Sequence, residues 1–296
     1  MMKYRGKISV GKVFCGLIMM LLALSMLVPL LNILAKSFSH PDLVHSLKGY
    51  EILPKGFSTV NYQVVLGQPI VIRSIFNSVF ITVVGVFINI ILTASAAYVL
   101  TRPNLVGKKV FMYFFIVMMI FEPGIVQEYL LMKDIHLLDN LFSMVLYKSV
   151  NVYYLIVLMR FMEEVPKSIV EAAKIDGAGH LNVLFKIMLP LCKIPLTTVG
   201  MFYAVYRWNE FFKSSIFLTS KNNTVLQVLL RQFVVNSDSE VIVGAANILA
   251  NNNIAQLDNG SLKATTIVVA VVPILLIYPI ILKHYTSGVM SGGVKE

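Results

Sequence analysis

Six apolar runs, each long enough to cross a lipid bilayer as a helix, constrain this chain more than any other feature of its sequence. They lie near residues 13–35, 74–98, 110–131, 140–161, 191–216 and 264–282. A hydrocarbon core of about 30 Å needs about 20 helical residues. Only 14% of the residues are charged, against about 25% in soluble domains. We predict an all-α, polytopic membrane protein with six transmembrane helices, forming one domain over residues 1–296.

Basic residues in the short loops predict the orientation, because cytoplasmic loops carry an excess of Lys and Arg. With the N-terminus inside, three basic segments face the cytoplasm: residues 3–12, 101–109 and 163–190. The opposite orientation would place this charge outside. We therefore expect both termini in the cytoplasm. Two long outer loops follow, at 36–73 with short helical turns and at 217–263 with an amphipathic helix around Val225 to Val235.

Charge and cysteine content exclude several other classes of protein. The net charge of +10 lies largely beside apolar runs, where topology and anionic membrane lipids explain it without nucleic acid. Cys15 and Cys192 have neither a disulfide framework nor metal-ligand spacing. The first run, 13–35, is too long for the h-region of a signal peptide, which has about 7–15 residues. We expect this run to be a retained helix and the chain to hold no metal.

A polar stretch punctuated by glycine separates the fourth and fifth runs and reads EAAKIDGAGHLNVLFKIMLP, residues 171–190. Pro166 suits the first turn of a helix over residues 167–175. Gly177 and a second glycine two residues later permit a sharp reversal, after which another helix runs to a stop at Pro190. The stretch predicts a short helix, a turn and a second short helix on the cytoplasmic face.

The first of these helices has a surface suited to a partner protein. Ala172 and Ala173 leave the helix flat, and Glu171 and Asp176 carry carboxylates that can bond to a basic or hydrogen-bonding cleft. We predict a cytoplasmic helix-turn-helix coupling loop over residues 163–190. The alternative is an ordinary amphipathic hairpin, which would tolerate many sequences at these positions.

Polar groups inside two of the apolar runs are candidates for a solute path. In the third run Glu122 precedes Pro123 and Gly124, and Gln127 and Tyr129 follow. A carboxylate is costly in lipid and so faces the bundle interior, while Pro and Gly free backbone groups that can line a cavity. We predict that Glu122, Gln127 and Tyr129 line the path or its outer gate. The alternative is a kink satisfied by neighbouring helices.

In the fifth run, Trp208, Asn209 and Glu210 lie about 22 Å from the cytoplasmic end at 1.5 Å per residue. Such side chains face protein or water, so the indole can stack on a sugar ring while its neighbours bond hydroxyl groups. The alternative is an interfacial Trp beside a local ion pair of Arg207 and Glu210.

No residue grouping indicates catalysis or nucleotide binding by this chain. Its histidines are scattered, and no Ser/His/Asp or Cys/His set is visible. Residues 6–13, GKISVGKV, nearly spell a phosphate-binding loop, but Val13 replaces the hydroxyl residue that would hold magnesium and no strand precedes them. We expect a subunit that is not an enzyme and binds no cofactor.

The polar stretch carries the pattern E-A-A-x3-G-x9-I-x-L-P, formed by Glu171, Ala172, Ala173, Gly177, Ile187, Leu189 and Pro190. This pattern closely resembles the coupling loop of permease subunits of bacterial ABC importers. Other stretches are similar to carbohydrate-importer permeases of the maltose G-subunit type, most of all their complex-oligosaccharide branch. These stretches are PKSIVEAAKIDGAG with FKIMLPL, WNEFF, TVLQVLLRQF and YPIILKHYTSGVMSGGVKE.

The resemblance implies a permease subunit in the bacterial cytoplasmic membrane that translocates a carbohydrate, an oligosaccharide, by alternating access. Its partners would be a second permease subunit, two ATPase subunits that bind ATP and Mg, and an extracytoplasmic solute-binding protein. By position, residues 171–177 would dock on an ATPase, the tail 288–296 would reach the ATPases, and part of 217–263 would touch the binding protein. The alternatives are an ion-coupled secondary transporter and an ABC permease for a polyamine or an anion.

The chain departs from this family at three positions. Relatives commonly read F-x-G-G-x-I-P-x-Y in the third span, where this chain has Pro123 for the first Gly and Gln127 for the Pro. The chain also ends in Glu296 where Gly is usual. The first two departures bear on gate geometry and substrate preference, and none touches the coupling loop.

Overall fold

The computed structural model describes residues 10–236 and 258–292. Within these residues the chain is helical, and its β structure is a single antiparallel bridge between Ser39 and Phe57. The contacts divide the chain into two compact units, Met1–Val71 with Leu230–Val271 and Ile72–Leu229 with Val272–Glu296. Each unit is described by itself.

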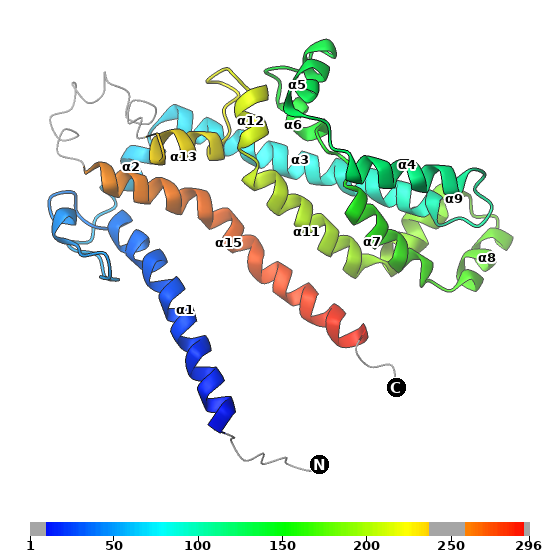
Figure 1. Cartoon of the computed structure of the whole chain (residues 1–296), viewed down its shortest axis with the longest axis horizontal. Coiled ribbons are helices and arrows are strands. Elements are labelled where there is room, and N and C mark those ends of the chain that lie inside the picture. Colours follow the sequence, from blue (N-terminus) through cyan, green and yellow to red (C-terminus); the bar gives the residue numbers. More distant parts are fainter. Residues whose placement is uncertain (1–9, 237–257, 293–296) are drawn as a thin grey trace. The chain divides into compact units, whose positions relative to one another are not determined.

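The helices follow one another with few long connections (Figure 1). They are α1 (Val10–Ser37), α2 (Val60–Leu66), α3 (Pro69–Leu100), α4 (Lys108–Ile120), α5 (Ile125–Asp134), α6 (Leu141–Leu146), α7 (Val152–Glu163), α8 (Lys167–Ile175), α9 (His180–Asn182), a π-helix (Val183–Met188), α10 (Leu189–Leu191), α11 (Lys193–Asn209), α12 (Phe212–Phe217), α13 (Leu226–Val234) and α15 (Asn259–Gly292). A 3-10 turn at Val44–Ser46 precedes α2.

Three helices in the described part of the chain are long and apolar enough to cross a membrane. They contain Gly11–Ser37, Pro69–Leu100 and Asn259–Leu276, with mean hydropathies of 2.5, 2.4 and 1.6. Two further candidates are bent pairs: α4 with α5, bent by 116°, and the stretch His180–Leu191 with α11, bent by 87°. If each bent pair is one span, the structure has up to five candidate spans.

The fourth predicted span, residues 140–161, is not one helix, and this prediction was wrong. The stretch divides into α6 and α7, and the 12 residues of α7 cover about 18 Å at 1.5 Å per residue, short of a core of about 30 Å. Asn151 lies at the break and starts α7, because its side chain caps this helix by accepting from the N–H of Tyr154 at 3.3 Å, and Asn140 caps the start of α6 by accepting from the N–H of Phe142 at 2.9 Å.

The first unit contains a folded segment around α2 with the short helical turns expected of the 36–73 loop. The Asn61 side chain is buried and donates to the carbonyl oxygens of Ser37 and Ser39 at 3.2 and 3.1 Å. It also accepts from the hydroxyl of Ser261 in α15 at 3.4 Å. Buried amides are stable when they are fully bonded, so Asn61 ties this segment to the start of α15.

The boundary between the two units falls within α13, and this helix has the amphipathic face expected around 225–235. Val225, Leu229 and Phe233 are buried, and the Asn77 side chain in α3 donates to the backbone carbonyls just before this helix. Asn77 thus holds the loop that precedes α13. The predicted outer loop covers residues 217–263, and within it residues 237–257 lie outside the described residues.

Asp139, between α5 and α6, organises the neighbouring loop of the second unit. Its carboxylate accepts from the N–H groups of Ser220 at 2.9 Å and Thr219 at 3.1 Å, and the Asn223 side chain donates to its backbone carbonyl. Because these donors favour the charged form, the N–H of Ser220 above all, the pKa of Asp139 lies below its ordinary value.

Candidate functional site

The C-terminus of α8 is a Schellman motif, in which one residue of left-handed conformation reverses the chain. The N–H of Ala178 donates to the carbonyl of Ala173 at 2.9 Å, and the N–H of Gly177 to that of Lys174 at 3.0 Å. Gly177 has a φ of 81°, which glycine adopts without steric cost. The motif has a fixed length, and the A-x3-G spacing of the sequence is the spacing that it requires.

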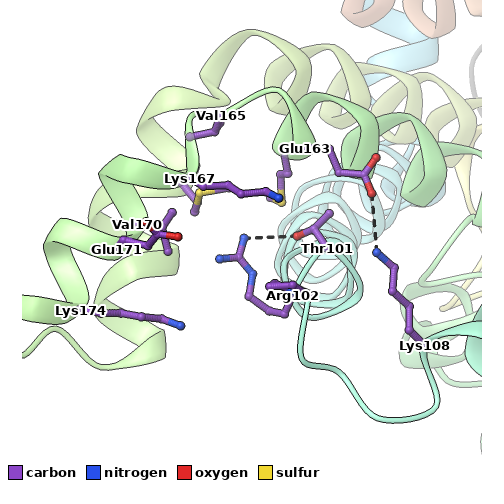
Figure 2. A pocket seen from close by; sticks show the side chains of 12 residues that line it. Thr101, Arg102, Lys108, Glu163, Val165, Lys167, Val170, Glu171 and Lys174 are labelled. Carbon is purple, nitrogen blue, oxygen red and sulfur yellow. Dashed lines mark hydrogen bonds and ion pairs between the residues drawn. The ribbon is translucent and has the colours of Figure 1, made fainter.

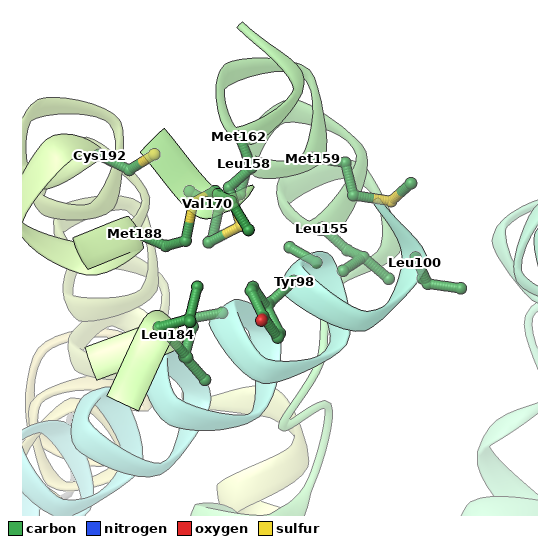
Figure 3. Close-up of a cluster of buried hydrophobic side chains, with 13 residues drawn as sticks. Tyr98, Leu100, Leu155, Leu158, Met159, Met162, Val170, Leu184, Met188 and Cys192 are labelled. Atoms are coloured by element: carbon green, nitrogen blue, oxygen red, sulfur yellow. The ribbon is translucent and has the colours of Figure 1, made fainter. Parts of the chain in front are cut away.

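A hydrophobic cluster holds α8 against the ends of α3 and α7 (Figure 3). Its buried residues are Ala94, Ala97, Tyr98, Leu100, Leu155, Leu158, Met159, Met162, Val170, Val183, Leu184, Met188 and Cys192. Ala173, Ala178 and Leu189 pack against it. Ala173, which the sequence analysis assigned to the partner-facing surface, therefore faces the protein's own core. The predicted coupling loop is a packed part of the second unit rather than a loose connection.

The opposite side of the loop is open. Glu171, Ala172, Asp176 and Gly177 are exposed, and so are two large apolar side chains, Ile175 at 86% and Leu181 at 72%. Exposed apolar side chains gathered at one place mark interaction surfaces. Sequence reasoning missed Ile175 and Leu181. Helical spacing could have identified Ile175. At about 100° per residue, this residue lies about 140° around the helix from Val170, which is buried, so the two side chains face different sides.

The second half of the motif is helical beyond the predicted stop. Ile187 and Leu189 are half-buried, and Pro190 is exposed. Helical backbone continues past Pro190 to Leu191, and the chain bends at Cys192. The second helix thus ends one residue beyond the predicted stop at Pro190, a difference within the usual spread of helix ends.

The second helix of the loop also bonds to α3. The hydroxyl of Tyr98 and Nδ1 of His180 are 3.1 Å apart, and the two rings meet edge to face with their centroids 6.1 Å apart. Both sides of the reversal are thus fixed to the same end of α3.

A cavity of about 470 Å³ opens at the break between α4 and α5. Glu122 lies in the break and lines this cavity, and its Oε1 is 2.9 Å from Nζ of Lys148. Tyr147, Asn151 and Tyr153 line the facing wall. Lys148 has a φ of 47°, an uncommon conformation for a residue with a side chain, and such positions cluster at functional sites. The cavity presents two carboxylates, those of Glu122 and Glu128, together with an ammonium, an amide and two phenol rings.

A buried ion pair lies beside this cavity. The Glu128 carboxylate lines it and bonds to Nζ of Lys213 in α12, and the Tyr147 hydroxyl donates to it at 3.2 Å. Buried charges need such partners, since an unpaired charge is costly away from water. Sequence reasoning did not place Glu128 in the site. The pairing joins residues far apart in the chain, so the sequence carried no local signal of it.

The other predicted path residues lie elsewhere and do not line this cavity. Trp208 is buried at 4% exposure, the Asn209 side chain donates to the carbonyl of Val205 at 2.9 Å, and Glu210 accepts from the N–H of Lys213 at 2.8 Å. Gln127 and Tyr129 are exposed on α5. Of the six predicted residues, Glu122 alone lines the cavity.

Arg207 does not pair with Glu210, so this part of the alternative interpretation was wrong. Its guanidinium is buried and donates to Oδ1 of Asn89 at 3.1 Å and to the carbonyls of Val145 at 3.0 Å and of Met144. These carbonyls lie at the C-terminus of α6, where the helix dipole favours a cation. Arg207 thus fastens α6 to α3 and α11.

No group of three or more His, Cys, Asp or Glu side chains in residues 10–236 and 258–292 is placed to hold a metal ion.

Comparisons with known proteins agree along almost the whole chain. Residues 89–291 match the family described as binding-protein-dependent transport system inner membrane component. The polygalacturonan/rhamnogalacturonan transport system permease protein of Bacillus subtilis (strain 168) is 33% identical over 283 residues, which cover 94% of this chain and 95% of that protein. The arabinooligosaccharides transport system permease protein of the same organism is 24% identical over 301 residues, and this match covers 100% of this chain and 100% of that protein.

One solved structure has a similar fold. It is a bacterial ABC transporter involved in the import of the acidic polysaccharide alginate, and it matches with a TM-score of 0.85 and 28% sequence identity. The match covers 96% of this chain and 99% of that chain.

Proposed function

This chain belongs to the family of inner membrane components of binding-protein-dependent transport systems, and we propose that it is the permease subunit of an ATP-driven importer that carries an oligosaccharide. It is a multi-pass membrane protein of bacterial type. Both termini lie in the cytoplasm in this proposal, because the basic segments then face inward. The subunit translocates its cargo by alternating access and performs no covalent chemistry.

The observation that carries this proposal is the exposed, rigidly held turn after α8. Its Schellman motif and the hydrophobic cluster fix its backbone, while Ile175 and Leu181 project from it. An ATPase subunit docks on this turn through apolar contact with both side chains and polar contact with Glu171. Because α8 packs against α3 and α7, a displacement of the turn by the motor moves those helices with it.

The assembly consists of this chain, a second permease subunit, two ATPase subunits and an extracytoplasmic solute-binding protein. ATP and Mg bind to the ATPase subunits and no cofactor binds to this chain. The apolar α1 fits a subunit embedded in lipid or against another membrane helix, since its spanning window is fully exposed in this chain alone. The binding protein contacts the outer loops at 36–73 and 217–263.

Carbohydrate is the cargo class supported by the relatives, whose names refer to polygalacturonan/rhamnogalacturonan and arabinooligosaccharides, and by the alginate importer. The cavity at the α4–α5 break suits this class. Glu122, Lys148 and Asn151 supply donors and acceptors for hydroxyl groups, and Tyr147 and Tyr153 supply ring faces. An ion-coupled secondary transporter, the alternative, does not agree with the family of the chain.

A charge reversal tests the docking role. In the assembled importer, Glu171→Lys should abolish uptake of labelled oligosaccharide and uncouple ATP hydrolysis from cargo, while the subunit still inserts in the membrane. Glu164→Lys is the matched control, because Glu164 is also exposed and lies in the same loop but outside the motif. Normal uptake by the Glu171 variant would show that the turn is not the coupling element.

A further inference from the structure

A second cavity, of about 420 Å³, lies beside α8 on the face of the coupling loop and is predominantly basic (Figure 2). It opens between the end of α3, the start of α4, the end of α7 and α8. Its inner wall is apolar and includes Met162, Val170 and Met188. Figure 2 shows Lys167 and Lys174 extending from α8 toward Arg102 at the end of α3. The coupling role proposed above uses none of these basic side chains.

The charges lining this cavity do not balance. Arg102, Lys108, Lys167 and Lys174 stand against two carboxylates, Glu163 and Glu171, which leaves an excess of two positive charges. Like charges gathered around one cavity raise the local potential and attract an anion.

The existing ion pairs do not remove this excess. The Glu163 carboxylate has two cationic partners: its Oε1 is 3.8 Å from Nζ of Lys108, and its Oε2 is 3.3 Å from Nη1 of Arg160. Arg160 does not line the cavity. In the described part of the chain, Lys167 and Lys174 form no ion pair, although Glu171 lies between them on the same helix. Two ammonium groups are therefore available to a ligand.

Arg102 is held in place rather than free to turn away. Its guanidinium lies over the Tyr98 ring at 4.2 Å from the centroid, and its Nε donates to the Tyr98 carbonyl at 3.2 Å. A second nitrogen is 3.4 Å from the Thr101 hydroxyl. A fixed guanidinium beside mobile ammonium groups is a combination suited to a phosphate group, which accepts several charge-assisted hydrogen bonds at once.

The position of the cavity points to the membrane surface. The 32 residues of α3 extend about 48 Å, longer than a hydrocarbon core of about 30 Å and close to the full bilayer of about 40–45 Å. A helix of this length that crosses a bilayer carries its end to the level of the lipid headgroups, and Thr101 and Arg102 follow α3 directly. Basic pockets between helices on the cytoplasmic side bind anionic headgroups.

We propose that the cavity lined by Arg102, Lys108, Lys167 and Lys174 is a phosphate-binding site that holds the headgroup of an anionic phospholipid against the coupling helix. Inorganic phosphate has the same chemistry and is the other source of this ligand. Bound phosphate offsets the excess positive charge and bridges α8 to the end of α3. The inference rests on the proposed function only in taking this face as cytoplasmic.

The test uses this subunit, purified together with any proteins that copurify with it and placed in nanodiscs. Native mass spectrometry measures bound phosphatidylglycerol against phosphatidylcholine for the wild type, the Lys108→Gln/Lys167→Gln variant, and Lys186→Gln. Lys186 is the matched control, because it is exposed on the same loop but does not line the cavity. A second arm measures binding of labelled inorganic phosphate in nanodiscs of phosphatidylcholine alone.

We expect the double variant to bind phosphatidylglycerol about 25-fold more weakly, at about fivefold for each cation removed, and the control to bind as the wild type does. If only inorganic phosphate shows this loss, the site binds free phosphate. Equal binding by the wild type and the double variant, or equal loss in the control, would overturn the proposal. Lys174→Gln alone is a second variant if the double variant does not assemble. Because binding is measured without ATP or cargo, failure of the uptake experiment leaves this result unaffected.

Discussion

Replacing Gly177 by alanine isolates the contribution of one backbone conformation to energy coupling. A Cβ at this position meets no atom within 4 Å, so the substitution creates no clash, and its effect comes from the φ of 81° alone. The left-handed conformation costs a residue with a side chain about 1–2 kcal/mol. Alanine also lowers the conformational entropy of the unfolded chain, and this effect stabilises the folded state by about 0.4–1 kcal/mol.

The net cost is therefore about 1 kcal/mol, which lowers the population of the formed turn relative to the open one by about fivefold. We expect a fall of up to about fivefold in the cargo-stimulated ATPase activity of the assembled importer, measured at a limiting ATPase subunit concentration. Gly177→Asn should lose less, because asparagine enters the left-handed region more readily than alanine.

Gly179→Ala is the matched control for this experiment. This glycine lies in the same loop and also has open space around its Cβ position, but its φ is −69°, which any residue adopts. We expect the control to retain full coupling. If the two alanine variants behave alike, the Schellman motif does not govern the active shape of the turn, and the reasoning is refuted.

Three further predictions follow from other parts of the structure. Ile175→Asp should reduce copurification of the ATPase at least tenfold, because it places a charge at the apolar contact, whereas the equally exposed Val106→Asp should not; a pull-down through this subunit compares the two. Gly85→Ala should lower the thermal unfolding midpoint, measured in detergent, because its Cβ would lie 3.1 Å from Nε of the buried Arg207; an unchanged midpoint would show that this side chain can yield. The pKa of Asp139 is lowered in the folded state. Its contribution to stability is therefore present above its unfolded pKa of about 3.9 and is lost as the pH falls through its lower folded value. Hydrogen exchange of the loop around Asp139 should show this loss at low pH, and Asp139→Asn should remove this dependence of exchange on pH.

Local chemistry allowed much of the fold to be predicted. The first, second and sixth apolar runs coincide with helices that are long enough to cross a membrane. The helix over residues 167–175 has the predicted bounds, because proline, helix formers and glycine act through the backbone of their own neighbours. The third to fifth runs are interrupted, since hydropathy averages over a window and does not register a side chain that caps a helix, such as Asn151.

The candidate site divides in the same way. The motif at residues 171–177 was visible because a Schellman motif has a fixed length in the sequence. The residues of the solute path were not visible in the sequence, because tertiary packing decides which side chains line a cavity. Glu122 was expected to face the interior; it lines a cavity, but its side chain is 67% exposed, whereas Trp208 is buried away from that cavity. No local pattern distinguishes these two outcomes.

The sequence by itself determined that the chain crosses a membrane, and it predicted on which side its basic loops lie and which turn meets a partner. These properties depend on composition over about 20 residues or on backbone geometry within one turn. Only the tertiary structure decided that Glu128 pairs with Lys213, that Arg207 bonds to Asn89 and α6, and that four basic side chains surround one cavity. Each of these depends on distances of a few ångströms between distant segments, because electrostatic and hydrogen-bond energies are set by such distances and not by separation along the chain.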